Sequence, residues 1–164
     1  MPLLPDQESE YRRLAISYWD FDEAAGFASA LSRLSERLGD TTAYAEALSQ
    51  AFVVSYMRPF KYSLSGDNTD RILDVKSIQF TESQQRWHRL IEQLRDQAVA
   101  HSDPLPLQLS VEEYPDWGLV PSMREPRVPF TIDGAAELLL LAVSVRDQVT
   151  DRLAKFGTHV TFRE

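Results

Sequence analysis

The sequence predicts a mainly α-helical bundle of four to five helices, formed by a single domain over residues 1–164. Apolar residues recur at helical spacing through most of the chain, while prolines gather in one insert at about 103–130. Hydrophobic residues make up 43% of the chain, which argues against disorder along most of its length. A chain of 164 residues is also too short for two well-packed cores, so we expect one.

The N-terminal region is expected to be helical throughout. From Glu8 to Leu38 apolar residues recur every three or four positions, and Gly39 then supplies a natural stop. The pattern fits one long helix or two consecutive helices with a break near residues 20–22.

A second helix is expected after Thr41 or Thr42, whose hydroxyl groups can cap it. It must end before Pro59, which cannot continue a helix. Residues 61–80 contain a dense turn signal and predict an ordered loop. Within that loop, the alternating residues 72–76 fit either a short strand or a helical turn.

A third helix is expected from Glu82 to His101. Thr81 and Gln84 fit a capping box, in which each side chain bonds the backbone N–H of the other residue. The helix carries one apolar stripe that ends in the imidazole ring of a histidine. The members of the stripe are Trp87, Leu90, Ile91, Leu94, Ala98 and His101.

Six prolines between residues 103 and 129 exclude a long helix in the insert. They leave room for short strands such as Leu107–Val111. The C-terminal residues Thr158–Phe162 alternate in the manner of a strand and could pair with the insert.

A last helix is expected over Gly134–Phe156, capped by Thr131 or Asp133 and stopped by Gly157. Its centre is apolar on nearly every face, so we expect it to be the most buried element. Leu140, at this centre, is expected to lie in the core.

Composition narrows the possible chemistry. The chain has no cysteine, so thiol chemistry and cysteine-based zinc sites are excluded. His88, His101 and His159 are too scattered for a local zinc motif, and no glycine-rich phosphate loop is present. We therefore expect neither a metal nor a cofactor.

The formal charge of −8 repels polyanions unless basic residues gather locally, which disfavours a broad nucleic-acid surface. No apolar run approaches the roughly 20 residues that cross a bilayer, and the first residues lack the pattern of a secretory signal. These features predict a cytoplasmic protein without a membrane partner.

Arg95, Asp96 and His101 carry the most distinctive chemistry of the sequence. An imidazole titrating near pH ~6.5 beside a permanent guanidinium can take a proton and hold a phosphate. Arg95 precedes His101 by six residues, about 120° around an ideal helix, so the two converge only if the helix end bends or a second copy supplies the partner. The alternative is that these residues have no function: the helix dipole favours a histidine at the C-terminal end, and Arg95 and Asp96 are surface charges solvated by water.

These three residues resemble the motif of the HEPN family (higher eukaryotes and prokaryotes nucleotide-binding domains), an arginine, a polar residue and a histidine after four to six intervening residues. Five residues intervene here. The likeness extends over about Thr42–Asp103 to bacterial HEPN-like proteins, many of them linked to phage defence. It rests on Arg58-Pro59-Phe60, Trp87-His88, Leu94-Arg95-Asp96 and Ala100-His101-Ser102-Asp103.

The resemblance implies a homodimer in which two motif helices face each other across a cleft, with metal-independent RNA cleavage in active members. Arg95 would then hold the phosphate and His101 would move the proton, while Asp96 would be a helper. The apolar stripe of the motif helix also suits a homodimer. Further candidates for the cleft lining are His88, Arg58, Ser102 and Asp103.

Two functional hypotheses stay open. The first is a HEPN-type endoribonuclease, a toxin or defence effector with RNA as substrate and an antitoxin or defence-system protein as partner. The second is a HEPN-like binding module that cuts nothing. The acidic charge favours the second, whereas the pairing of Arg95 with His101 favours the first.

Overall fold

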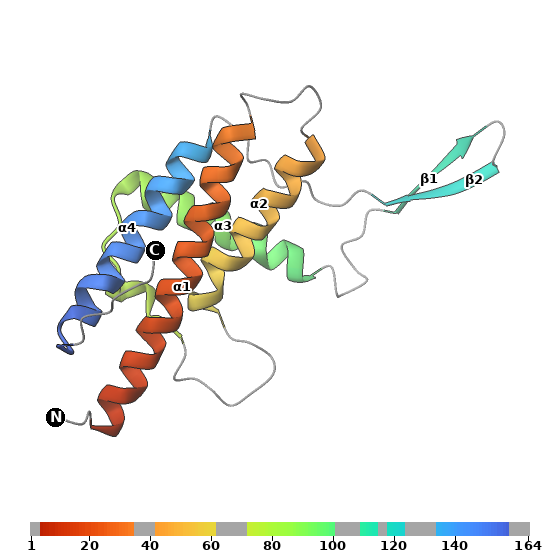
Figure 1. The fold of residues 1–164 in the computed structure, drawn as a ribbon. Helices are drawn as coiled ribbons and strands as arrows, with labels where there is room; N and C mark the ends of the chain where they lie inside the picture. The colour runs from red at the N-terminus through yellow and green to blue at the C-terminus, as the bar shows by residue number, and fades with distance from the viewer. Residues whose placement is uncertain are drawn as a thin grey trace.

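The computed structural model describes residues 4–34, 42–61, 72–100, 109–114, 118–123 and 134–157. Four α-helices form a bundle, and a two-stranded hairpin stands apart from them (Figure 1). The prediction of a helical bundle with short strands in the insert is confirmed. In chain order the elements are α1 (Pro5–Leu34), α2 (Thr42–Met57), the 3-10 turns η1 (Arg58–Phe60) and η3 (Val75–Ser77), α3 (Glu82–Ala100), β1 (Leu109–Tyr114), β2 (Gly118–Met123) and α4 (Ala135–Ala154).

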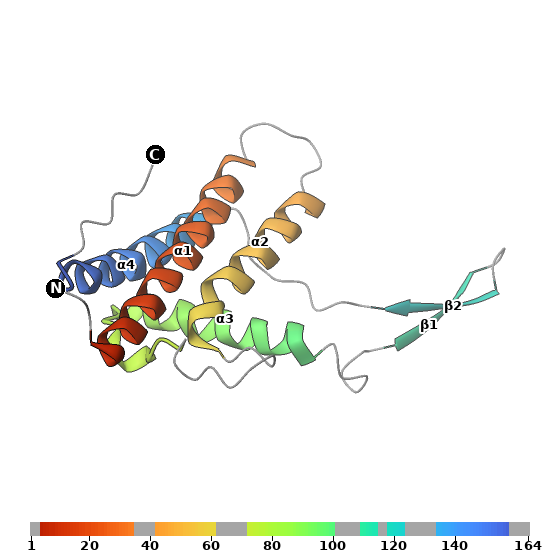
Figure 2. The same ribbon diagram turned by 60° about the horizontal axis from the view of Figure 1, so that its bottom comes forward.

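The helices α4, α1 and α2 lie side by side, and α3 crosses one face of this layer (Figures 1 and 2). The longest helix, α1, packs against both α4 and α2, while α3 packs mainly against α2. Of the two arrangements left open for the N-terminal region, the single helix is correct. Phe21, at the suspected break, is fully buried and extends the inner face of α1 without interruption.

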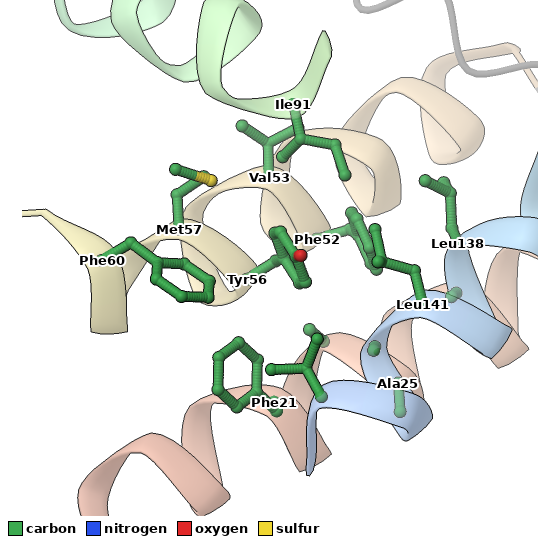
Figure 3. Packing of buried hydrophobic residues seen from close by; sticks show 14 of the residues in the cluster. Phe21, Ala25, Phe52, Val53, Tyr56, Met57, Phe60, Ile91, Leu138 and Leu141 are labelled. Atoms are coloured by element: carbon green, nitrogen blue, oxygen red, sulfur yellow. The ribbon is translucent and has the colours of Figure 1, made fainter. Parts of the chain in front are cut away.

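Aromatic rings fill the core where α1, α2 and η1 meet (Figure 3). Tyr56 stacks on Phe52, with ring centroids 5.6 Å apart, and its ring also lies 5.6 Å from Phe21 and 5.8 Å from Phe60. Pro59 falls within η1, so α2 ends where the sequence predicts. The aromatic packing fixes η1 against the bundle and thereby positions the residues that follow it.

The last helix, α4, buries Leu138, Leu141 and Val145 toward the core. The prediction that Leu140 is a core residue is wrong, because the residue is 66% exposed. Residues buried at steps of three and four leave position 140 on the outer face. Gly157 ends the helical region with a φ of 68°, which suits glycine, as predicted.

The start of α4 differs from its predicted cap. Gly134 occupies the N-cap position without a side-chain hydrogen bond, while the expected caps Thr131 and Asp133 lie outside the described residues. A Cβ atom built on Gly134 would come within 3.1 Å of the Trp87 ring of α3. The absence of a side chain at this position therefore lets α3 approach the first turn of α4 closely.

A 3-10 turn precedes α3, and the two strands lie between α3 and α4 in the chain. The alternatives left open for residues 72–76 are decided in favour of a helical turn, η3, whose start is capped by Asp74 through a 2.9 Å bond from the Lys76 N–H. In the insert, β1 pairs antiparallel with β2 and runs past the predicted end at Val111 to Tyr114. The proposed pairing of residues 158–162 lies outside the described residues. Among the described helices, none is both long and apolar enough to cross a membrane.

Candidate functional site

The helix α3 carries the described part of the candidate site. The predicted capping box is confirmed: the Gln84 N–H donates to Thr81 Oγ1 at 3.2 Å, and the Thr81 N–H donates to Gln84 Oε1 at 2.9 Å. This cap fixes where the helix begins and therefore which side chains face the bundle.

The apolar stripe of α3 is largely used inside one chain. Ile91 and Leu94 are buried against the bundle, and Trp87 and Leu90 are partly buried against the same core. The stripe was expected to serve a dimer interface, but most of it packs within the monomer. Of the stripe members whose side chains are described, Trp87 and Leu90 are the ones that retain surface for a partner chain.

Arg95 and Asp96 follow near the C-terminal end of α3. The Arg95 guanidinium donates through Nη1 to Asp96 Oδ1 at 3.3 Å. The Arg95 side chain is 26% exposed and that of Asp96 is 52% exposed, so both reach solvent. This contact holds the arginine beside a carboxylate, as an orienting role for Asp96 would require.

Sequence reasoning missed Lys61, which completes the charged cluster. Lys61 follows η1 directly, and its Nζ donates to Glu92 Oε1 at 2.8 Å and to Asp96 Oδ2 at 3.3 Å. The hydrogen bond to Glu92 is the main cause that raises the pKa of Lys61, which therefore stays charged. No sequence pattern links Lys61 to residues more than 30 positions away, so only the packing of α3 on α2 reveals it.

We name Lys61, Glu92, Arg95 and Asp96 the charged tetrad. Two cations and two carboxylates make its net charge zero at neutral pH. Asp96 is the central member, because its two oxygens accept from different cations. An added anion would have to compete with this carboxylate for both cations.

His88 lies in the core and not along an open surface, because only 5% of it is exposed. Tyr56 Oη and His88 Nδ1 share a hydrogen bond of 3.0 Å, and the rings of Phe60 and Phe80 each lie 4.9 Å from the imidazole. Burial is the main cause that lowers the pKa of His88. A neutral, enclosed imidazole is poorly placed to line a cleft or to donate a proton to a substrate.

Arg58 is held by α1. Its Nη1 donates to Asp20 Oδ1 at 2.6 Å and to Glu23 Oε2 at 3.4 Å, while the Ser55 hydroxyl donates to the same Glu23 oxygen at 2.7 Å. Desolvation is the main cause that raises the pKa of the Asp20 carboxyl, and Arg58 opposes it. Arg58 therefore acts within the monomer as the partner of a buried carboxylate.

His101, Ser102 and Asp103 lie outside the described residues, which on α3 end at Ala100. The separation between Arg95 and His101 consequently stays a prediction from the sequence. In the part of the chain that is described, no three acidic or histidine side chains come together in a way that could hold a metal ion.

Comparison with known proteins gives no relative: no family model, curated protein or solved structure matches the chain. The functional argument therefore depends on the chemistry of this chain's own residues.

Proposed function

We propose that this protein is a HEPN-like endoribonuclease that cleaves RNA without a metal ion. Arg95 binds the scissile phosphate, and His101 takes the proton from the 2′-hydroxyl. The attack of the 2′-oxygen on phosphorus then breaks the bond to the 5′-oxygen and leaves a 2′,3′-cyclic phosphate. The 5′-oxygen leaves with a proton from an acid, for which His101 of the partner subunit is the candidate.

The observation that carries the proposal is the placement of Arg95. The capping box and the buried residues of α3 fix the phase of the helix, and within that phase Arg95 reaches solvent at the end that leads directly to His101. A guanidinium fixed in this way can stabilise charge that develops on phosphate.

The dimer is part of the same proposal, because one chain supplies a single His101. Trp87 and Leu90 are only partly buried within the monomer and offer apolar surface for a second copy of α3. A strictly monomeric mass by light scattering at micromolar concentration would remove the composite site.

A second candidate function is a binding module that does not cleave RNA. The zero net charge of the tetrad favours this second function, since one donor of Arg95 is already bonded to Asp96. The net charge of −8 on the whole chain favours it as well. In either function, a phosphate that binds Arg95 must displace the Asp96 carboxylate or share the guanidinium with it.

The test is incubation of purified protein with mixed RNA in the presence of EDTA. We expect cleavage by the wild type, 2′,3′-cyclic phosphate ends and intact DNA, with loss of cleavage in the Arg95→Ala, His101→Ala double variant. The control is Arg89→Ala, which removes an exposed arginine from the same helix. Cleavage that needs a metal, or that cuts DNA equally, would contradict the proposed mechanism, and a wild type that binds RNA without cutting would favour the binding module.

The cellular role proposed with this activity is that of a toxin or phage-defence effector. Expression of the wild type in bacteria should then arrest growth, whereas the Arg95→Ala, His101→Ala variant should not. Equal growth with both proteins would contradict the cellular role and leave the proposed RNA cleavage to be decided by the assay with purified protein.

A further inference from the structure

Lys61 is anchored by its neighbour in the chain. Phe60 is 7% exposed and packs against Phe21 and His88, with ring centroids 5.5 and 4.9 Å away. Because the preceding residue is fixed in the core, the backbone at Lys61 emerges at a defined point beside α3. Its long side chain then needs to find only one partner position, which lowers the entropy that an ion pair costs.

The side chain of Lys61 reaches the same carboxylate as Arg95. Lys61 Nζ lies 3.3 Å from one oxygen of Asp96, and Arg95 Nη1 lies 3.3 Å from the other oxygen. The carboxylate of Asp96 therefore bridges the two cations. They come from opposite sides of the contact between η1 and α3, so a substrate bound there would touch both segments.

Counted against the described residues alone, both cations keep donors for an additional acceptor. An ammonium has three N–H groups, of which the contacts to Glu92 and Asp96 use two, and a guanidinium has five, of which Asp96 uses one. The side chains of Lys61 and Arg95 are 24% and 26% exposed. Within the described residues, the donors left over can reach solvent and hence a ligand.

We propose that Lys61 is a second phosphate-binding residue of the site and binds the RNA backbone together with Arg95. The inference rests on the proposed function for its ligand, an RNA phosphodiester, and extends it to a residue on another segment. Two cations around Asp96 suit a ligand that carries several anionic oxygens, since each cation binds a separate oxygen while Asp96 keeps them apart.

Glu92 separates this role from a purely structural one. If Lys61 only joins η1 to α3, removal of the charge on Glu92 harms the protein as much as removal of the charge on Lys61. If Lys61 binds phosphate, Glu92→Gln leaves the cation in place and lessens the competing negative charge. Lys61→Gln is thus expected to weaken RNA binding, whereas Glu92→Gln is not.

The experiment measures the affinity of a short, mixed-sequence, fluorescently labelled single-stranded RNA as a function of salt. All proteins carry His101→Ala, so that the RNA is not consumed. We expect Lys61→Gln to weaken binding about three- to tenfold near 0.1 M salt and to make the slope of log Kd against log salt shallower by about 0.7, the loss of one phosphate contact. Lys61→Arg should restore most of the affinity, and Glu92→Gln should not weaken binding.

The matched control is Lys76→Gln, which removes the same charge from an exposed lysine in η3. Equal effects of Lys61→Gln and Lys76→Gln would overturn the inference and leave the proposed cleavage untouched. Equal weakening by Lys61→Gln and Glu92→Gln would assign Lys61 a structural role and overturn it as well. RNA binding that depends on Lys61 in a protein whose wild type does not cleave would support the inference while the proposed cleavage fails, and a protein that does not bind RNA would overturn both.

Discussion

Two polar residues of α3, His88 in the middle and Arg95 nearer the C-terminal end, lie in opposite environments. His88 is enclosed by Tyr56, Phe60 and Phe80 and shares a hydrogen bond with the buried Tyr56 hydroxyl. Two turns later, Arg95 lies partly in solvent and shares a carboxylate with a lysine from another segment. The two residues are seven positions apart on nearly the same helical face, so position on the helix does not separate them.

The difference between them comes from what packs opposite. Aromatic rings cover His88, whereas Arg95 lies beside Asp96, a carboxylate that Lys61 also contacts. Desolvation favours a neutral His88, while the hydrogen bond to Glu92 favours a charged Lys61 beside the later part of the helix. The comparison teaches that a polar residue on a helix face is structural where aromatic rings enclose it and a candidate for chemistry where charged side chains lie beside it.

The largest expected effect is on activity at the charged end. Arg95→Ala should lower kcat/KM for RNA by about 10²- to 10³-fold, because it removes a fixed cation from the developing charge. Arg95→Lys should recover only part of the rate, since an ammonium cannot bind phosphate in the bidentate manner of a guanidinium. Kinetics on the purified variants would measure both effects, and an unchanged rate in Arg95→Ala would break the comparison.

The next largest effect is expected on stability, at the enclosed His88. His88→Ala should lower the free energy of unfolding by about 2–4 kcal/mol, because it opens a cavity among aromatic rings and leaves the Tyr56 hydroxyl without its partner. Arg95→Ala, which removes a partly exposed ion pair, should cost less than about 1 kcal/mol. Urea denaturation followed by fluorescence would compare them.

The pair Leu141→Ala and Leu140→Ala calibrates this measurement on α4. The fully buried Leu141 should lose about 2–5 kcal/mol, while the exposed Leu140 should change stability by no more than about 0.5 kcal/mol. Equal costs for His88→Ala and Leu140→Ala would show that His88 is not held as the comparison requires.

A smaller effect is expected from the hydrogen bond alone. Tyr56→Phe keeps the aromatic packing and removes only the hydroxyl that pairs with His88 Nδ1, so it should cost about 1–2 kcal/mol. Thermal melting of the variant would measure the loss. A cost as large as that of His88→Ala would mean that packing contributes little to the enclosure.

The smallest expected effect is the response of stability to pH. Burial lowers the pKa of His88 below its ordinary value of 6.5, Glu92 raises it and Lys61 lowers it further. The unfolded chain therefore binds the proton more readily, so the contribution of neutral His88 is complete above about pH 6.5 and decreases as the pH falls through that window. The melting temperature should fall less steeply from about pH 7 to about pH 5 in His88→Gln than in the wild type, and parallel slopes would contradict the role given to His88.

The sequence by itself determined the helices and several of their ends. Thr81 with Gln84 located the start of α3, Pro59 ended α2, and Gly157 ended the helical region after α4. These predictions succeed because caps, prolines and glycines act on the backbone within one turn of themselves. Such local signals can therefore be identified from the sequence alone.

Only the tertiary structure decided which side chains meet. Leu140 and Leu141 are alike in type and adjacent in sequence, and packing alone makes one exposed and the other buried. The contact of Lys61 with Asp96 spans 35 residues and that of Tyr56 with His88 spans 32, distances at which helical periodicity carries no information. Periodicity fixes the faces of a single helix, whereas the partner of each face is set by how the helices fill a common core.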